Sequence, residues 1–126
     1  GKYRLGEAFA LKDAQGQPVT SNVFLASKSP LDPSASPGDP GGFYQDASIV
    51  ALQRRGVVFL TCHTAVEEQS RSLVKGGFAP AGMTAQDVAD DILTHLIPGA
   101  IVVPSMVATV AVLQATFHYT YATLTF

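Results

Sequence analysis

Apolar residues recur along this chain in short runs whose spacing separates strands from helices. Residues 57–60 are continuously apolar and largely β-branched, which is typical of a strand covered on both faces, and we expect this strand to extend through Thr61. A second buried strand is expected over residues 100–103, stopped by Pro104. Residues 118–126 alternate between two faces and predict a last strand.

Helical spacing alternates with these strands. Helices are expected over residues 2–10, 43–55, 64–74, 85–96 and 106–116, and a further short strand over residues 19–26. Gly56 and the pair Gly76 and Gly77 supply C-terminal stops, and Thr84 with Asp87 three residues later resembles a capping box. The order of elements predicts an α/β fold whose mainly parallel sheet is flanked by helices.

Residues 1–126 are expected to form a single α/β domain, because a chain of 126 residues can bury one core but not two. Within it, residues 27–42 form a loop rich in proline and glycine, with too little apolar area to pack by itself. Loops of this length are usually lids, binding loops or contact arms, and disorder is the alternative.

The charge content is low, and this shifts the expected partners toward other copies of the chain. Charged residues make up 14% of the sequence, whereas globular chains average about 25%. The formal net charge of −2 and the scattered basic residues exclude an electrostatic case for nucleic acid. No apolar run approaches the roughly 20 residues of a membrane span. We therefore expect much of the surface to face other subunits.

The helix expected over residues 106–116 has almost no polar face, since only Thr109 and Gln114 interrupt its apolar side chains. A helix that is apolar all round is buried all round. This helix, together with the aromatic strand over 118–126, is therefore predicted to form a subunit interface. The alternative is an ordinary edge helix with some exposed alanine and valine.

Cys62 is the only cysteine, and it follows a predicted strand where a helix is about to begin. In a parallel sheet this position lies at the carboxyl edge, the usual place for ligands and chemistry. Free backbone N–H groups at a helix start stabilise a thiolate and make it more reactive at neutral pH. The alternative is a small buried hydrophobic residue. A single cysteine excludes an internal disulfide.

His63 stands beside Cys62 and is a candidate acid or site-lining group, although neighbours on a strand point to opposite faces. Thr64 opens the next helix, and Ser105, at the end of the second strand, could line the same pocket. The three histidines show no metal-ligand spacing, so no metal site is expected. No phosphate loop or dinucleotide fingerprint occurs, and we expect no cofactor.

Three segments together resemble the DsrE/DsrF-like sulfur-relay family. They are Val57 to Thr64, with the cysteine after a buried strand; Leu96 to Ser105, with a Leu-x-Pro-Gly start and a Val-Pro-Ser end; and Leu113-Gln114 followed by Tyr119 to Tyr121. The resemblance covers roughly residues 56–121. It implies a three-layer α/β fold, assembly into trimers or hexamers, and a cysteine, here Cys62, that carries persulfide sulfur.

Family members begin with a strand–helix–strand unit that this sequence does not show, so we expect the chain to lack or borrow that unit. Because no initiator methionine or signal peptide opens at Gly1, we expect a processed fragment of a longer chain, with an upstream fragment or partner chain as a further partner. The resemblance also implies export to the periplasm or the extracellular space. The competing hypothesis is a structural subunit of a homo-oligomer or filament, in which Cys62 only packs.

Overall fold

A short parallel sheet stands at the centre of the described structure. The computed structural model describes residues 1–13, 15–22, 25 and 48–123. Strands β1 (Leu60–Cys62) and β2 (Ile101–Val103) pair in parallel, with Cys62 opposite Val103. The helices are α1 (Leu5–Ala8), α2 (Ile49–Arg54), α3 (His63–Lys75), α4 (Ala85–Thr94) and α5 (Met106–Phe117). The described chain is therefore a mixed α/β arrangement.

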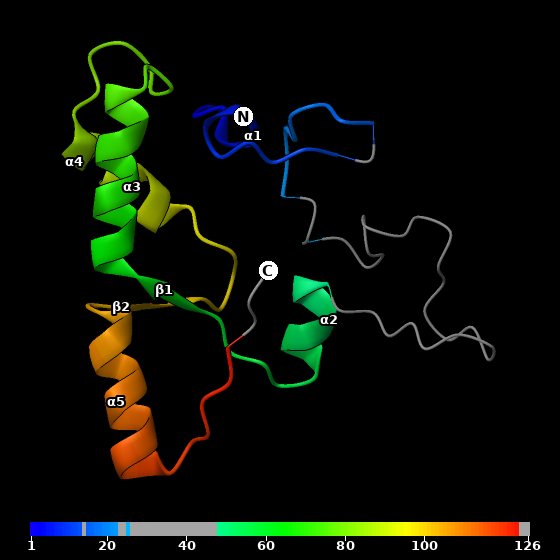
Figure 1. Cartoon of the computed structure of the whole chain (residues 1–126), viewed down its shortest axis with the longest axis vertical. Coiled ribbons are helices and arrows are strands. Elements are labelled where there is room, and N and C mark those ends of the chain that lie inside the picture. Colours follow the sequence, from blue (N-terminus) through cyan, green and yellow to red (C-terminus); the bar gives the residue numbers. More distant parts are fainter. Residues whose placement is uncertain (14, 23–24, 26–47, 124–126) are drawn as a thin grey trace, which may run out of the picture.

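The two long helices that follow the strands leave the sheet in opposite directions (Figure 1). Helix α3 rises from β1 and packs along α4, whereas α5 leaves β2 on the far side of the sheet. The short helix α1 lies beside α3, and α2 precedes β1. Among the described helices, none combines the length and the apolar character needed to span a membrane.

The core lies between α3, α4 and the N-terminal segment. Leu73 of α3 is 2% exposed, Val88 of α4 is fully buried, and Tyr3 closes the cluster from the N-terminus. Complete burial of one such aliphatic side chain contributes about 1.5–3 kcal/mol to folding. Ser70 is buried in the same region without an unpaired polar atom, because its Oγ donates to the Val66 carbonyl oxygen at 2.7 Å.

Local signals set the helix boundaries where the sequence predicted them. The capping box is confirmed: Asp87 N–H donates to Thr84 Oγ1, while Thr84 N–H donates to the Asp87 carboxylate. This bond from Thr84 is the main reason that the pKa of Asp87 lies below its ordinary value. Gly56 and Gly77 stand just beyond α2 and α3 with φ of +86° and +72°, values that favour glycine.

The prediction that both strands are buried on two faces is wrong for the described structure. Val58, just before β1, is 60% exposed, and Ile101 of β2 is 52% exposed. The reason is architectural: only two strands pair in the described part of the chain, and α5 covers neither face closely. A continuous apolar run therefore indicated a strand but not the layers that would cover it.

The last predicted strand is also not formed, since residues 118–123 have no regular structure and no sheet neighbour. Residues 124–126 lie outside the described residues. Similarly, residues 19–22 and 25 form no strand; the adjacent segment has only an isolated bridge between Lys12 and Pro18. Strands need partners, and alternation in the sequence does not supply them.

The helix predictions hold with shorter or shifted ends. The helix expected over 2–10 is only the single turn Leu5–Ala8, and the helix expected over 43–55 is Ile49–Arg54, with residues 43–47 outside the described part. The helices expected over 64–74, 85–96 and 106–116 are α3, α4 and α5. The proline-rich loop predicted at 27–42 lies wholly outside the described residues.

Because Leu73 is buried in the α3–α4 core, replacing it with alanine should lower the free energy of unfolding by about 2–5 kcal/mol. Its neighbour Val74 is 36% exposed, so Val74→Ala should change that free energy by about 0.5 kcal/mol or less. Urea denaturation followed by circular dichroism measures both. Equal losses for the two variants would contradict this assignment of the core.

Candidate functional site

Cys62 ends β1 and directly precedes the first turn of α3. It is the N-cap residue of that helix, with an extended backbone (φ −79°, ψ 114°), so its side chain stands next to the free N–H groups of the first turn. Its thiol is reduced and only partly buried. The predicted position at the carboxyl edge of the sheet is confirmed, and the deep packing position is not observed.

The pKa of the Cys62 thiol lies below its ordinary value because backbone N–H groups favour the thiolate. The N–H of Ala65 in α3 contributes most, the N–H of Met106 in α5 comes next, and the N–H of Thr64 adds a smaller effect. Partial burial acts in the opposite direction but does not outweigh them. The N–H groups act on the sulfur electrostatically. The Cys62 side chain accepts no capping hydrogen bond from the first turn of α3.

Two helix starts therefore meet at one sulfur atom. The β1–β2 register sets this meeting, because Cys62 lies opposite Val103 and α5 begins three residues later at Met106. A side-chain bond ties the two turns together: Thr64 Oγ1 donates to the Pro104 carbonyl oxygen at 2.9 Å. Thr64 thus contributes its backbone to the electrostatics and its hydroxyl to the positioning of the second helix start.

Ser105 occupies the N-cap position of α5 but makes no side-chain capping bond. Its carbonyl oxygen accepts from both the backbone N–H and the Oγ1 of Thr109, at 3.0 and 2.8 Å. Ser105 therefore directly precedes Met106, whose N–H acts on Cys62, and its hydroxyl does not cap α5. Its expected role in lining a pocket stays a prediction.

His63 follows Cys62 as the first residue of α3, but its ring is directed along the helix. Its Nδ1 lies 3.7 Å from Glu67 Oε1, one turn further on, and the side chain is 42% exposed. Histidine does not appear among the groups that lower the pKa of Cys62. His63 is thus adjacent to Cys62 in the sequence, but its ring lies near Glu67.

An apolar cavity of about 380 Å³ opens beside the thiol. Its walls come from α1, β1, α3 and α4, and the residues that matter most here are Leu5, Phe9, Cys62, Val66 and Ile92. Among the described residues that line it, Thr61 and Gln69 contribute polar side chains. The cavity can therefore hold an apolar group next to the Cys62 sulfur, whose ionised form is stabilised by backbone N–H groups.

Sequence reasoning missed two parts of this site. The Met106 N–H was not singled out, although its place just after the second strand was a usable signal. The walls from Leu5 and Phe9 could not be found, because they come from a segment more than fifty residues away. Within the described parts of the chain, no three histidine, cysteine or acidic side chains gather as a metal site would require.

Comparison of the chain with protein-family models, with curated proteins and with solved structures finds no match. We therefore infer the function from the geometry around Cys62.

The depressed pKa of Cys62 predicts that its alkylation rate, measured against pH, will have a midpoint below that of an ordinary thiol. The ionised form is favoured, so the reactive thiolate persists as the pH falls. Thr64→Val removes the bond to Pro104 and should move the midpoint upward. Thr94→Val, which removes a similar hydroxyl bond to a backbone carbonyl but within α4, is the matched control and should leave the midpoint unchanged.

Proposed function

We propose that Cys62 is the sulfur-carrying residue of a DsrE-like sulfur-handling protein. The observation that carries the proposal is the convergence of two helix starts on the Cys62 thiol beside an apolar cavity. A thiolate that is available at neutral pH is the form that attacks sulfur. The cavity beside it suits a small thiol-reactive molecule with an apolar substituent.

The reaction requires no cofactor. The Cys62 thiolate attacks the outer sulfur of a small persulfide, R–S–SH, and forms a new sulfur–sulfur bond. The bond between the two sulfur atoms of the donor breaks, and RS⁻ leaves with the electron pair. Cys62 then carries a persulfide, and the proton stays on the terminal sulfur. The transfer is balanced without an external oxidant, because one sulfur–sulfur bond replaces another.

The surroundings of the thiol support a carrier in particular. The N–H groups of Ala65, Met106 and Thr64 favour negative charge on the attacking sulfur. The cavity offers a largely apolar space for the donor. His63 is paired with Glu67, so the proposal assigns the activation of the thiol to backbone groups and not to a cysteine–histidine pair.

The proposal extends to the fold and the compartment. A DsrE-like protein would have a three-layer arrangement with more parallel strands beside β1 and β2, and these would cover the exposed apolar strand residues. Such strands would be supplied by other parts of a longer chain or by a partner chain. Export from the cytoplasm is part of the same proposal.

Treatment of the native protein with a low-molecular-weight persulfide should add the mass of one sulfur atom at Cys62, detected by intact-mass and peptide mass spectrometry. A reducing agent should restore the original mass. Cys62→Ser should gain nothing, and denatured protein should react more slowly at neutral pH, because unfolding removes the N–H groups that lower the pKa. Native protein that remains unmodified under these conditions would refute the carrier role.

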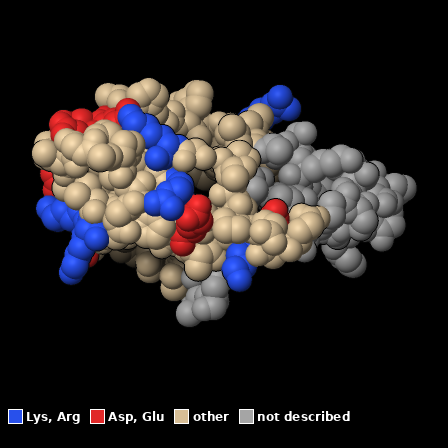
Figure 2. Space-filling model, turned by 90° about the horizontal axis from the view of Figure 1, so that it is seen from above, with Lys and Arg blue, Asp and Glu red and all other residues tan. Residues whose placement is uncertain are grey.

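A second candidate function is favoured by one specific observation, the uncovered helix α5. None of its residues is buried, Val107 is 83% exposed, and it packs extensively against no other described element. Acidic and basic side chains lie side by side on the face of the molecule seen in Figure 2, whereas α5 contains no acidic or basic residue. We propose that α5 mediates assembly of a homo-oligomer, which is compatible with a carrier or with a purely structural subunit.

Size-exclusion chromatography with light scattering should show a multimer of the wild-type chain. Val107→Glu should shift it toward smaller species, since a charge in an apolar contact is costly to desolvate. Val74→Glu places the same charge at an exposed site on α3 and is the control. A wild-type protein that is monomeric at all concentrations tested would exclude assembly through α5.

A further inference from the structure

Residues 1–10, here called the N-terminal strap, lie beside the α3–α4 pair and include the single turn α1. One strap side chain, Tyr3, belongs to the buried core with Leu73 and Val88. The large apolar side chains Leu5 and Phe9 remain 44% and 40% exposed. The strap therefore contacts the core through the Tyr3 ring and the partly buried Ala8, while Leu5 and Phe9 are incompletely covered.

Polar contacts fasten the strap to α4 at one carboxylate. The Tyr3 hydroxyl donates a short hydrogen bond to Asp91, and Lys2 Nζ lies 3.0 Å from the same Asp91 Oδ2. These two donors, the tyrosine hydroxyl first, hold the pKa of Asp91 below its ordinary value. The Lys2–Asp91 pair is largely exposed, so water screens it.

Arg4 provides the attachment to the end of α3. Its Nη2 donates to the Gly77 carbonyl oxygen at 2.8 Å, and its guanidinium lies 5.0 Å from the centre of the Phe78 ring. The strap is thus held by polar groups at Arg4 and Asp91, by the buried Tyr3 ring and by Ala8, which packs against the core. Helices α3 and α4 also pack directly against each other, so their pairing does not depend on the strap alone.

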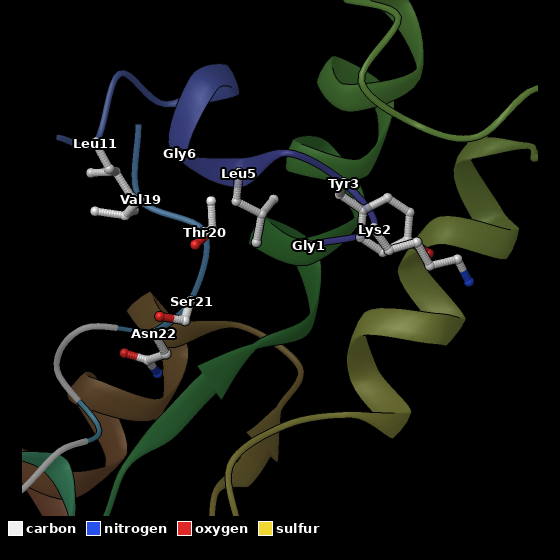
Figure 3. A pocket seen from close by; sticks show the side chains of 10 residues that line it. All are labelled: Gly1, Lys2, Tyr3, Leu5, Gly6, Leu11, Val19, Thr20, Ser21 and Asn22. Carbon is white, nitrogen blue, oxygen red and sulfur yellow. The ribbon is translucent and has the colours of Figure 1, made fainter. Parts of the chain in front are cut away.

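The strap forms a wall of the cavity beside the reactive thiol. Leu5 and Phe9 line that cavity together with Cys62. Leu5 also lines a second apolar cavity of about 370 Å³, with Leu11 and Val19 (Figure 3). In that view Lys2 and Tyr3 reach toward α4, whereas Leu5 lies over the sheet. Leu5 therefore borders both cavities, and a displacement of the strap would change the lining of each.

The backbone at both ends of α1 is strained. Arg4 and Ala10 have φ of +43° and +53°, in the left-handed region that residues other than glycine rarely adopt. Such a backbone conformation is unfavourable for a residue with a side chain and persists only while surrounding contacts hold it. Release of the strap would relieve both, so these two positions are suited to act as hinges.

We propose that the N-terminal strap is a lid that controls access to the Cys62 cavity. It is closed while Tyr3 and Lys2 bind Asp91, and it opens by rotation at Arg4 and Ala10 while α3 and α4 remain folded. The proposal concerns access to the site described above, and it holds whether or not Cys62 carries sulfur. A failure of persulfide uptake and a failure of the lid are thus separate results.

The test compares alkylation of native Cys62 by a bulky maleimide and by iodoacetamide. Asp91→Asn and Tyr3→Phe weaken the latch, and each should raise the bulky-to-small rate ratio by about three- to tenfold. A change in the thiol pKa alone would alter both rates together and leave the ratio constant. Tyr3→Phe keeps the aromatic ring and hence the core packing, so it remains informative if Asp91→Asn folds poorly.

Asp90→Asn is the matched control, because Asp90 accepts from Gln86 within α4 and has no bond to the strap. Its rate ratio should equal that of the wild type. Hydrogen exchange should increase in residues 1–10 of the two latch variants and stay unchanged in α3 and α4. The lid is refuted if the latch variants share the ratio of the control, or if exchange rises equally across α3 and α4.

Discussion

The parallel pairing of β1 with β2 is the constraint from which the candidate site follows. Because Cys62 lies opposite Val103, the chain leaves both strands at the same edge of the sheet and begins a helix there each time. The N–H groups of α3 and α5 consequently approach one sulfur atom. A shift of the register would separate the second helix start from the thiol and remove much of the reason for its lowered pKa.

The thiol experiences two opposing effects, and their balance decides its character. Partial burial favours the neutral form, whereas oriented backbone groups favour the thiolate, and the backbone groups prevail. The pKa of Cys62 therefore lies below its ordinary value although the cavity beside it is largely apolar. The hydroxyl of Thr64, bonded to Pro104, keeps the two helix starts together and couples the position of α5 to the state of the thiol.

Stability and exposure are distributed unevenly over the molecule. The buried side chains belong to α3, α4 and the N-terminal strap, while β2 and α5 present apolar side chains to solvent. Asp91 is the last Asp, Glu, Lys or Arg of the chain, so the segment that follows α4 carries only two histidines, His95 and His118, besides uncharged side chains. Contiguous exposed apolar surface of this kind is typical of an interaction site.

The sequence by itself determined the local features: the capping box at Thr84, the helix stops at Gly56 and Gly77, and the place of Cys62 between a strand and a helix. These depend on neighbours a few residues apart, whose chemistry is visible in the sequence. The order of elements likewise indicated α/β structure. Only the tertiary structure decided that the N–H of Met106 acts on the thiol, that the N-terminal strap lines its cavity, and that β1 is only partly buried while β2 stays largely exposed. Such features depend on which distant segments of the chain contact one another. Hydrophobic periodicity indicates the face that a segment would bury, but it does not specify the segment that covers that face.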